Sequence, residues 1–242
     1  MSNLKLDFFE SLMQAEDLND RWEKLISGLH YQFGITGVFY GVHYSKNYAC
    51  NNGVLSKIDC VTNYPEQFLN QDTDSLDSDR SAHHCAVSTS PILWQSPEML
   101  FDLTPEEQKL QNVLKDLDME VGVTIPIHKT QGYGGVGLVS MGANPNDFRK
   151  RWYEYGDDIQ EIVALFDALY RNEFLESKYP INVEQGGILN RLIEGQPPKE
   201  IAINLGVTDK TVTNKINTLK LMLDARTTPQ LTAKAKSLKL VD

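Results

Sequence analysis

The segment Pro198–Leu223, PKEIAINLGVTDKTVTNKINTLKLML, contains two short helical patterns separated by a glycine. Its first residue is a proline, which suits the first turn of a helix. Ile201, Ala202 and Leu205 then fall on one face, and Gly206 follows where a left-handed residue commonly ends a helix. The first pattern therefore predicts a helix that stops at a tight turn.

The second pattern predicts a helix with a polar outer face. Thr208 is a suitable N-cap, and Val212, Ile216 and Leu219 repeat at helical spacing, so they should face inward. The opposite side carries short polar and basic side chains, which reach base edges and phosphates when such a helix lies in a major groove. We predict DNA contacts from Thr208, Lys210, Thr211, Thr213, Asn214, Lys215 and Asn217.

The charge distribution favours a nucleic-acid partner for the C-terminal part. Residues 181–242 contain nine Lys and Arg against six Asp and Glu, a net charge of +3, whereas residues 1–180 contain 14 against 27, a net charge of −13. Neutralisation of phosphates supplies much of the affinity of proteins for DNA. Two helices joined by a glycine turn also occur in proteins that bind no nucleic acid, and a basic face is often only a solvated surface. The charge asymmetry favours the DNA interpretation.

A longer set of motifs surrounds this pair of helices. It consists of Leu189, Gly195, KEIA at 199–202, LGVT at 205–208, Thr211-Val212 and SLKLV at 237–241. With these residues, segment 181–242 resembles the DNA-binding domain of LuxR-type transcriptional regulators, the quorum-sensing family. The segment departs from the family pattern at Gln185, Lys215, Met222-Leu223 and Thr227-Thr228. These departures affect the expected choice of promoter more than the expected fold.

The composition of the whole chain fits a globular protein with two modest cores. It has 242 residues, of which 41% are hydrophobic. No run approaches the roughly 20 apolar residues of a membrane span, and the acidic N-terminus lacks a signal-peptide core. We therefore expect a cytoplasmic protein without a membrane partner. Cys50, Cys60 and Cys85 have no CxxC spacing, which favours reduced thiols, and we expect no metal or cofactor.

Residues 1–176 alternate helical and extended patterns. Segment 6–33 has apolar residues at helical spacing, and Thr104-Pro105-Glu106-Glu107 is a capping-box start for a helix that should end near Leu117. Runs rich in β-branched and aromatic residues predict strands. These runs are 37–44, 58–62, 121–128 and 135–141, with a glycine-rich hairpin turn expected at 132–134.

The predicted fold class is α+β. We expect an N-terminal α/β/α sandwich around a mostly antiparallel sheet and a C-terminal all-α helix-turn-helix domain. The first domain is placed at residues 1–176, a linker at 177–181 and the second domain at 182–242.

A second set of motifs lies in the N-terminal part. It consists of Asn63-Tyr64-Pro65, Asp79, PILW at 91–94, Gly122 with Pro126, and Ser140. In these residues the segment is similar to the autoinducer-binding domain of the same family. The resemblance implies a pocket for a small diffusible signal, in which Asp79 accepts the amide N–H of an acyl-homoserine lactone and Trp94 packs on its ring. We predict ligand contacts from Tyr40, Tyr64, Phe68, Asp79, Trp94, Gly122 and Ser140.

Two residues that hold the lactone's carbonyls in the family are not matched. Phe68 stands where the family has tryptophan, and Gln71 or Asp72 stands near the tyrosine position. An unpaired carbonyl in a closed pocket costs roughly 1–3 kcal/mol. Either other donors replace them, with Tyr40, Tyr64, His83 and His84 as candidates, or the ligand is not a standard acyl-homoserine lactone. We favour the second hypothesis; a ligand-independent regulator and a heterodimerising anti-activator are the further alternatives.

Structural roles compete with these functional ones. Asp79 can cap a helix, Phe68 and Trp94 can be core aromatics, and Ser140 can bond to a neighbouring backbone group. His83-His84-Cys85 invites a metal interpretation, but adjacent residues on a helix point about 100° apart and do not converge on one ion.

An enzyme is the main alternative class. The sequence contains no GxSxG elbow, no HExxH motif and no common phosphate-binding glycine loop. We therefore assign no catalytic residues.

Segment 147–174 carries an apolar stripe formed by Ile159, Ile162, Val163, Phe166, Leu169 and Tyr170. In the family, helices here help to make a dimer, so the resemblance implies a homodimer on a two-fold symmetric site. The stripe can equally pack on the sheet of its own domain. We expect the signal to stabilise the dimer or to shift the orientation of its DNA-binding domains.

Overall fold

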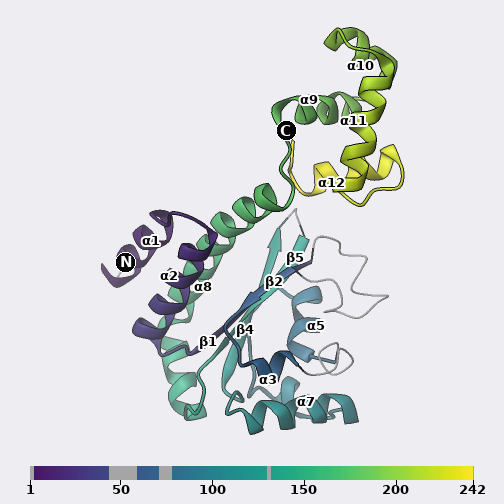
Figure 1. Ribbon diagram of the computed structural model, residues 1–242. Coiled ribbons are helices and arrows are strands. Elements are labelled where there is room, and N and C mark those ends of the chain that lie inside the picture. Colours follow the sequence, from purple (N-terminus) through teal and green to yellow (C-terminus); the bar gives the residue numbers. More distant parts are fainter. Residues whose placement is uncertain (1–2, 44–58, 71–77, 130–131, 242) are drawn as a thin grey trace. The chain divides into compact units, whose positions relative to one another are not determined.

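The computed structural model describes residues 3–43, 59–70, 78–129 and 132–241 (Figure 1). The chain divides into two compact units, residues 1–170 and 171–242. The division falls inside helix α8, Pro145–Lys178, so the predicted linker at 177–181 begins as helix.

A five-stranded antiparallel sheet forms the centre of the first unit. Its order is β2-β1-β5-β4-β3, which confirms the expected antiparallel sheet. The strands are β1 (Gly37–His43), β2 (Asp59–Thr62), β3 (Ile92–Leu93), β4 (Gly122–Lys129) and β5 (Gly132–Val139). One expectation is wrong: the glycines at 132–134 do not form a turn but begin β5, where Gly132 pairs with Lys129 and Gly134 pairs with Ile127 of β4.

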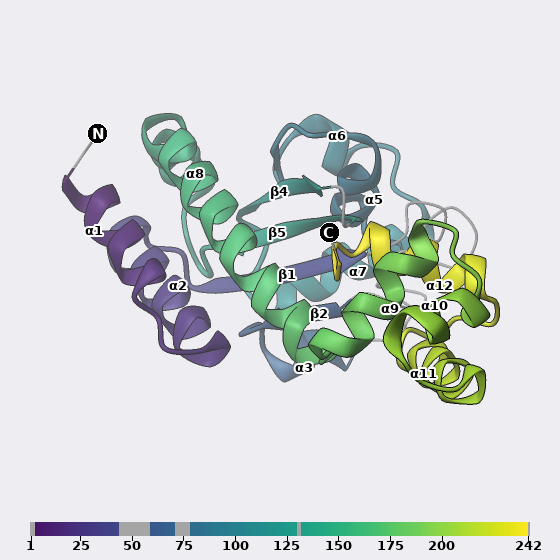
Figure 2. The same ribbon diagram turned by 90° about the horizontal axis from the view of Figure 1, so that it is seen from above.

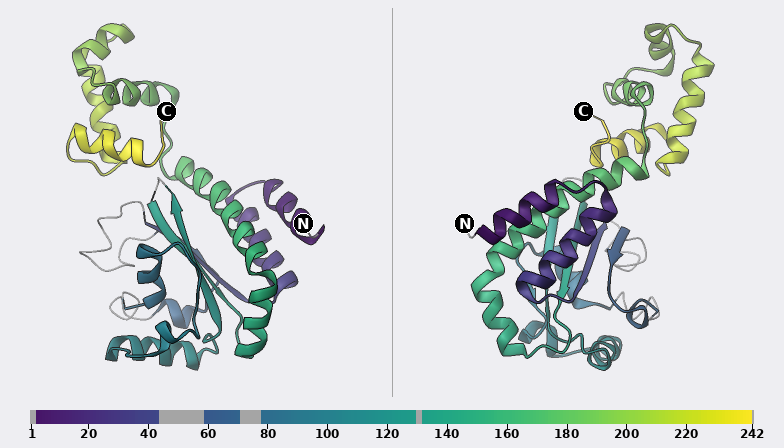
Figure 3. Two further views of the ribbon diagram at one scale, coloured as in Figure 1. Left: turned by 180° about the vertical axis from the view of Figure 1, so that it is seen from behind. Right: turned by 60° about the vertical axis from the view of Figure 1, so that its left-hand side comes forward.

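Helices α1 (Asn3–Met13), α2 (Leu18–Phe33) and α8 cover one face of the sheet (Figures 2 and 3). The predicted amphipathic stretch is thus two helices, because the Asp17 side chain accepts a hydrogen bond from the backbone N–H of Asp20 and starts α2. The Nζ atom of Lys5 bonds to Asp158 and Glu161 at 2.6 and 2.7 Å, which fastens α1 to α8.

The apolar stripe of α8 is buried within the first unit. Ile162, Val163 and Phe166 are at most 1% exposed, and α8 crosses β1 and β5 in Figure 2. The stripe therefore packs in its own unit, and these three residues are not accessible to a second copy of the chain.

Shorter helices cover the opposite face, which confirms the predicted α/β/α sandwich (Figure 1). They are α3 (Glu66–Leu69), α5 (Arg80–Val87), α6 (Pro97–Leu100) and α7 (Pro105–Asp116). The expected capping box is present at the start of α7, between Thr104 and Glu107, and Leu117 is the C-cap.

The second unit contains α9 (Val183–Ile193), α10 (Pro198–Leu205), α11 (Asp209–Met222) and α12 (Thr228–Ser237). Gly206 ends α10 at φ 67°, and Thr208 caps α11, both as predicted. Five of the six residues predicted to face inward are buried, namely Ile201, Ala202, Val212, Ile216 and Leu219, whereas Leu205, at the end of α10, is half-buried. None of the helices in the described ranges is long and apolar enough to cross a membrane.

Candidate functional sites

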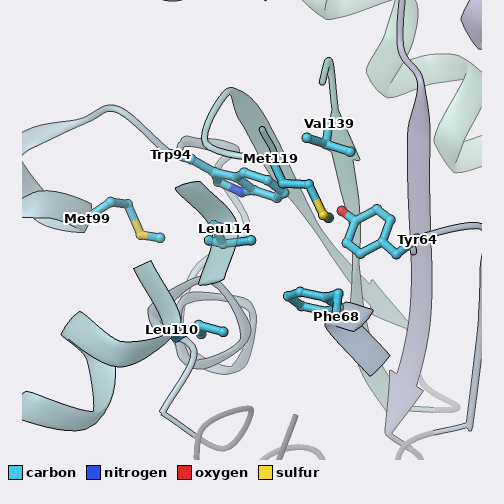
Figure 4. Close-up of a cluster of buried hydrophobic side chains, with 8 residues drawn as sticks. All are labelled: Tyr64, Phe68, Trp94, Met99, Leu110, Leu114, Met119 and Val139. Atoms are coloured by element: carbon cyan, nitrogen blue, oxygen red, sulfur yellow. The ribbon is translucent and has the colours of Figure 1, made fainter. Parts of the chain in front are cut away.

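A cavity of about 270 Å³ lies in the first unit, between the sheet and the layer of α3, α5 and α7. An engineered apolar cavity of about 150 Å³ holds benzene, so this space suits the buried part of a small molecule. Its aromatic and sulfur-containing wall is shown in part in Figure 4. The lining residues include Phe39, Tyr64, Phe68, Asp79, Cys85, Trp94, Met99, Leu110, Leu114, Thr124, Gly135 and Gly137.

Glycines on β5 make room for the groups around this cavity. A Cβ atom on Gly137 would lie 2.8 Å from the Tyr64 Oη atom and 3.6 Å from the Trp94 ring. A Cβ atom on Gly135 would collide with the Cys85 Sγ atom. Because alternate residues of a strand face the same side, these two glycines leave a stretch of bare backbone beneath the cavity.

Tyr64 supplies a buried hydroxyl that has no partner among the described residues. The side chain is 7% exposed and lines the cavity. Burial, and then the Asp79 carboxylate, raise the pKa of Tyr64 well above its usual value. The hydroxyl therefore stays protonated at neutral pH and can donate a hydrogen bond to a ligand oxygen.

Asp79 caps a helix and also lies in the cavity wall. Its carboxylate caps α5, accepting from the Ser81 backbone N–H at 2.8 Å and from the Ser81 hydroxyl at 3.0 Å. It also lines the cavity. Burial raises its pKa, although the bonds from Ser81 oppose that shift. A carboxylate has about four lone-pair positions, so it can accept from a ligand while it caps the helix.

Trp94 and Thr124 form a buried hydrogen-bonded pair in the cavity wall. The Trp94 Nε1–H donates to the Thr124 Oγ1 atom at 2.8 Å. The indole N–H is thus in use, whereas the Thr124 hydroxyl has its own hydrogen left to donate. The sequence carries no signal for Thr124, because a threonine inside a strand is also a common structural residue.

Phe68 lies at the predicted place but offers only an apolar surface. Its ring packs edge to face against the ring of Tyr64, with the ring centroids 5.3 Å apart (Figure 4). Both side chains line the cavity. Gln71 and Asp72 lie outside the described residues.

Three predicted ligand contacts do not line the cavity. Tyr40 points to the α8 face, where its hydroxyl donates to Asp167 at 2.8 Å. The Ser140 hydroxyl donates to the Gly34 carbonyl oxygen at 2.7 Å, so it fills the structural role considered above. Gly122 allows the Trp94 ring to approach the sheet, since a Cβ atom there would lie 2.6 Å from that ring. It therefore supports the cavity wall without lining it.

The cysteines and histidines that the structure describes were the candidates for a metal site. No group of three or more His, Cys, Asp or Glu in the described ranges could hold a metal ion. Burial raises the pKa of Cys85 to about 12, so its thiol is neutral. Cys60 is a free thiol too, and Cys50 lies outside the described residues.

In the second unit, α11 presents a polar outer face. Lys210, Thr213, Asn214 and Asn217 are exposed, and their side chains have no hydrogen-bond partner among the described residues. Lys215 differs from this group, because its Nζ atom lies 2.6 Å from a Glu184 carboxylate oxygen in α9.

Thr208 and Thr211 are engaged at the start of α11. The Thr208 hydroxyl accepts from the Thr211 backbone N–H, and the two hydroxyls are 2.8 Å apart. Both threonines therefore hold the N-terminus of the helix. Of the seven predicted DNA contacts, four therefore form the free face of α11, which consists of Lys210, Thr213, Asn214 and Asn217.

Comparison with known proteins identifies the first unit. Residues 20–171 match the family model of the autoinducer binding domain. The chain belongs to the autoinducer-binding domain family. No curated protein sequence matches it.

Solved structures share the fold of this autoinducer-binding family member. Escherichia coli SdiA has a TM-score of 0.60 at 14% identity, covering 98% of this chain and 97% of that one. A complex of SdiA with octanoyl-rac-glycerol has a TM-score of 0.57 at 14% identity, covering 97% and 93%. CepR2 of Burkholderia cenocepacia, an N-acylhomoserine lactone dependent LuxR family transcription factor, has a TM-score of 0.53 at 15% identity, covering 69% and 95%.

Arg80 anchors the wall of the cavity, a role that the sequence did not reveal. It donates to both carboxylate oxygens of Glu107, at 2.7 and 2.9 Å. It also donates to the carbonyl oxygens of Glu98, Phe101 and Asp102. Arg80 thereby ties α5, which begins next to the cavity residue Asp79, to α6 and α7.

The Arg80→Ala variant should lose about 2–3 kcal/mol of stability at pH 7, because hydrogen bonds to charged groups contribute about 1.5–3 kcal/mol each and this pair is partly exposed. Arg80 lowers the pKa of Glu107 from 4.5 to about 2. The pair therefore stabilises the fold fully above about pH 4.5, and this contribution is lost as the pH falls toward 2. Urea unfolding of the wild type and of Arg80→Ala between about pH 4.5 and pH 2 should show that the difference in their stability becomes smaller as the pH falls.

Glu106→Gln is the matched control, since Glu106 is exposed in the same turn and has no contact with Arg80. Between pH 4.5 and pH 2, the stability of Glu106→Gln should fall by the same amount as that of the wild type. A constant difference between wild type and Arg80→Ala across the whole window would contradict the assigned pair.

Proposed function

We propose that this protein is a signal-responsive transcription regulator that binds a small neutral ligand in its first unit and DNA through its second. The observation that carries the ligand part is the buried, unpartnered hydroxyl of Tyr64 in the wall of a cavity. A buried polar group without a partner costs about 1–3 kcal/mol. A ligand oxygen that accepts a hydrogen bond from the Tyr64 hydroxyl would remove that cost. The position of this hydroxyl in a mainly apolar cavity therefore supports a ligand-binding role.

The polar groups of the cavity define the chemistry of the ligand. Tyr64 and Thr124 offer hydroxyl donors to ligand oxygens, and the Asp79 carboxylate offers an acceptor to a ligand N–H or O–H. Among the described residues that line the cavity, Asp79 is the only carboxylate, and none is Lys, Arg or His. An anionic ligand would be repelled by Asp79 in this apolar space. The ligand is therefore a neutral molecule that carries both a donor and acceptor oxygens.

A ligand other than a standard acyl-homoserine lactone remains our proposal. Phe68 offers no donor, and the Trp94 N–H already bonds to Thr124. The complex of SdiA with octanoyl-rac-glycerol shows that a protein of this fold accommodates a ligand without a lactone ring. An acyl-homoserine lactone whose carbonyls bond to Tyr64 and Thr124 is the alternative.

Native mass spectrometry of the protein purified from its own host tests the ligand proposal, because a tightly bound ligand stays with the protein and reports its mass. A neutral, non-lactone adduct is the expected result, and an acyl-homoserine lactone mass would support the alternative. Thermal unfolding with octanoyl-rac-glycerol and with a panel of lactones is the second measurement. Ligand at 100 times its Kd adds about 2.7 kcal/mol of stability. No shift with any compound and no adduct would contradict a ligand-binding function.

The DNA part of the proposal rests on the free polar face of α11. Because the second unit carries a net charge of only about +3 over residues 181–242, one copy should bind weakly. We propose a homodimer on a two-fold symmetric site, where two recognition helices about one DNA turn apart act together. Light scattering and binding to symmetric duplexes test this arrangement.

Two lysines of α11 should respond differently in a DNA-binding assay. Lys210 is exposed and unpaired, so Lys210→Ala should reduce the slope of log K against log salt by about 1 for each copy bound. Lys215 is held by Glu184, so Lys215→Ala should change the slope much less. Fluorescence anisotropy of labelled DNA, measured at salt concentrations from about 50 to 200 mM, gives the slope for each variant. Equal slopes for the two variants would contradict the assignment of the free face.

A further inference from the structure

Four of the predicted DNA contacts lie together on the outer face of α11, and two of them are asparagines. Successive residues of a helix are about 100° apart, so Lys210, Thr213, Asn214 and Asn217 lie within an arc of about 100° around the helix axis. This arc is opposite the buried residues Val212, Ile216 and Leu219, which are at most 3% exposed. The four exposed side chains therefore project together from the second unit.

The two asparagines of this arc are available for recognition. Neither side-chain amide has a hydrogen-bond partner among the described residues, and both residues are exposed. They are three positions apart, which brings their Cβ atoms to about 5–6 Å from each other. Base pairs stack about 3.4 Å apart, so two such amides can address neighbouring or next-neighbouring base pairs.

The chemistry of this face favours adenine over guanine. An asparagine amide offers one donor and one acceptor, which match the N7 acceptor and the N6 donor on the major-groove edge of adenine. Guanine offers two acceptors there and is most often read by arginine or lysine. No arginine occurs in α11, and Lys215 is engaged by Glu184. Lys210, in the first turn, is the one cation on the arc, and it has no ion-pair partner in the described part of the chain.

We infer that Asn214 and Asn217 read adenine bases in the operator half-site, while Lys210 contacts the phosphate backbone. This inference rests on the proposed DNA-binding function and adds the identity of the bases. The half-site should therefore contain A·T pairs at the positions opposite the middle of α11. A well-placed bidentate contact discriminates by about 1–3 kcal/mol, which corresponds to roughly 5- to 150-fold in affinity for each asparagine.

Selection of binding sites by the full-length protein from a pool of random DNA duplexes tests the inference. The wild type should enrich adenine at one or two positions of each half-site. Asn214→Ala and Asn217→Ala should each abolish the preference at one of these positions. The loss of affinity caused by a base change there should become at least about fivefold smaller than in the wild type. Lys210→Ala should weaken binding to all sequences alike.

Asn204→Ala is the matched control, because Asn204 is exposed in α10 and its amide bonds to Gln196 at 3.4 Å. It should leave the selected sequence unchanged. Enrichment of guanine at the positions that respond to Asn214 or Asn217, or a selected sequence that neither substitution alters, would overturn the adenine assignment while DNA binding itself stands. If no duplex binds at 50 mM salt, the proposed DNA-binding function fails, and the adenine assignment fails with it.

Discussion

The Tyr64→Phe variant should be more stable than the wild type without ligand and should bind the ligand more weakly. Removal of a buried, unpartnered hydroxyl relieves a cost of about 1–3 kcal/mol. For a unit of this size that corresponds to a rise in Tm of about 2–4 °C per kcal/mol. In the complex, the same substitution leaves a ligand oxygen without its donor. We expect an affinity loss of roughly 5- to 150-fold.

The opposite signs of these two effects separate a ligand-binding role from a structural one. Thermal unfolding with and without the ligand found by mass spectrometry measures both effects. Tyr31→Phe is the matched control, because Tyr31 is 87% exposed and should change neither quantity. A Tyr64→Phe protein that is less stable without ligand would show that the hydroxyl already has a partner within the fold. Unchanged affinity would show that it does not contact the ligand.

Substitutions at Gly137 should close the cavity from beneath. The added Cβ atom of Gly137→Ala would lie 2.8 Å from the Tyr64 Oη atom, closer than such atoms approach one another, so the tyrosine must move. Gly137→Val adds two further methyl groups near the Trp94 ring. Overpacking of this kind typically costs 1–3 kcal/mol. We expect Gly137→Val to reduce ligand affinity by at least a hundredfold, because it both fills the cavity and displaces the Tyr64 hydroxyl.

A double variant tests whether the collision with Tyr64 is the cause. Gly137→Ala combined with Tyr64→Phe lacks the oxygen that the new methyl group meets, so it should recover most of the stability lost in Gly137→Ala. Stability without ligand should therefore be non-additive, which a double-mutant cycle measures. Simple additivity of the two substitutions would contradict the close approach of Tyr64 to β5. Unchanged ligand binding by Gly137→Val would contradict the location of the ligand site.

Local signals explain why parts of the fold were predictable. A helix start depends on a few adjacent residues, so the Thr104 capping box and the Thr208 cap could be recognised from the sequence. The inward face of α11 follows from the helical repeat alone. The glycines at 132–134 were misplaced, because glycine suits a turn and also a strand position where a neighbouring backbone approaches closely.

The side of β1 that faces the cavity depended on information that the sequence does not contain. Alternation along β1 shows that Phe39 and Tyr40 face opposite sides, but it does not show which side has the cavity. Tyr40 faces α8 and bonds to Asp167, whereas Phe39 lines the cavity. The partners of Lys215 and Arg80 were hidden for a related reason. Glu184 and Glu107 are distant in sequence and come close only through helix packing.

The sequence by itself determined the helix-turn-helix pattern, the sandwich of helices around an antiparallel sheet, and Asp79, Tyr64, Phe68 and Trp94 as cavity residues. The tertiary structure decided which polar groups are free. The Trp94 N–H and the Ser140 hydroxyl are bonded, and no other described residue bonds to the Tyr64 hydroxyl. Periodicity and capping are properties of neighbouring residues, whereas the availability of a hydrogen-bonding group depends on every segment that packs around it.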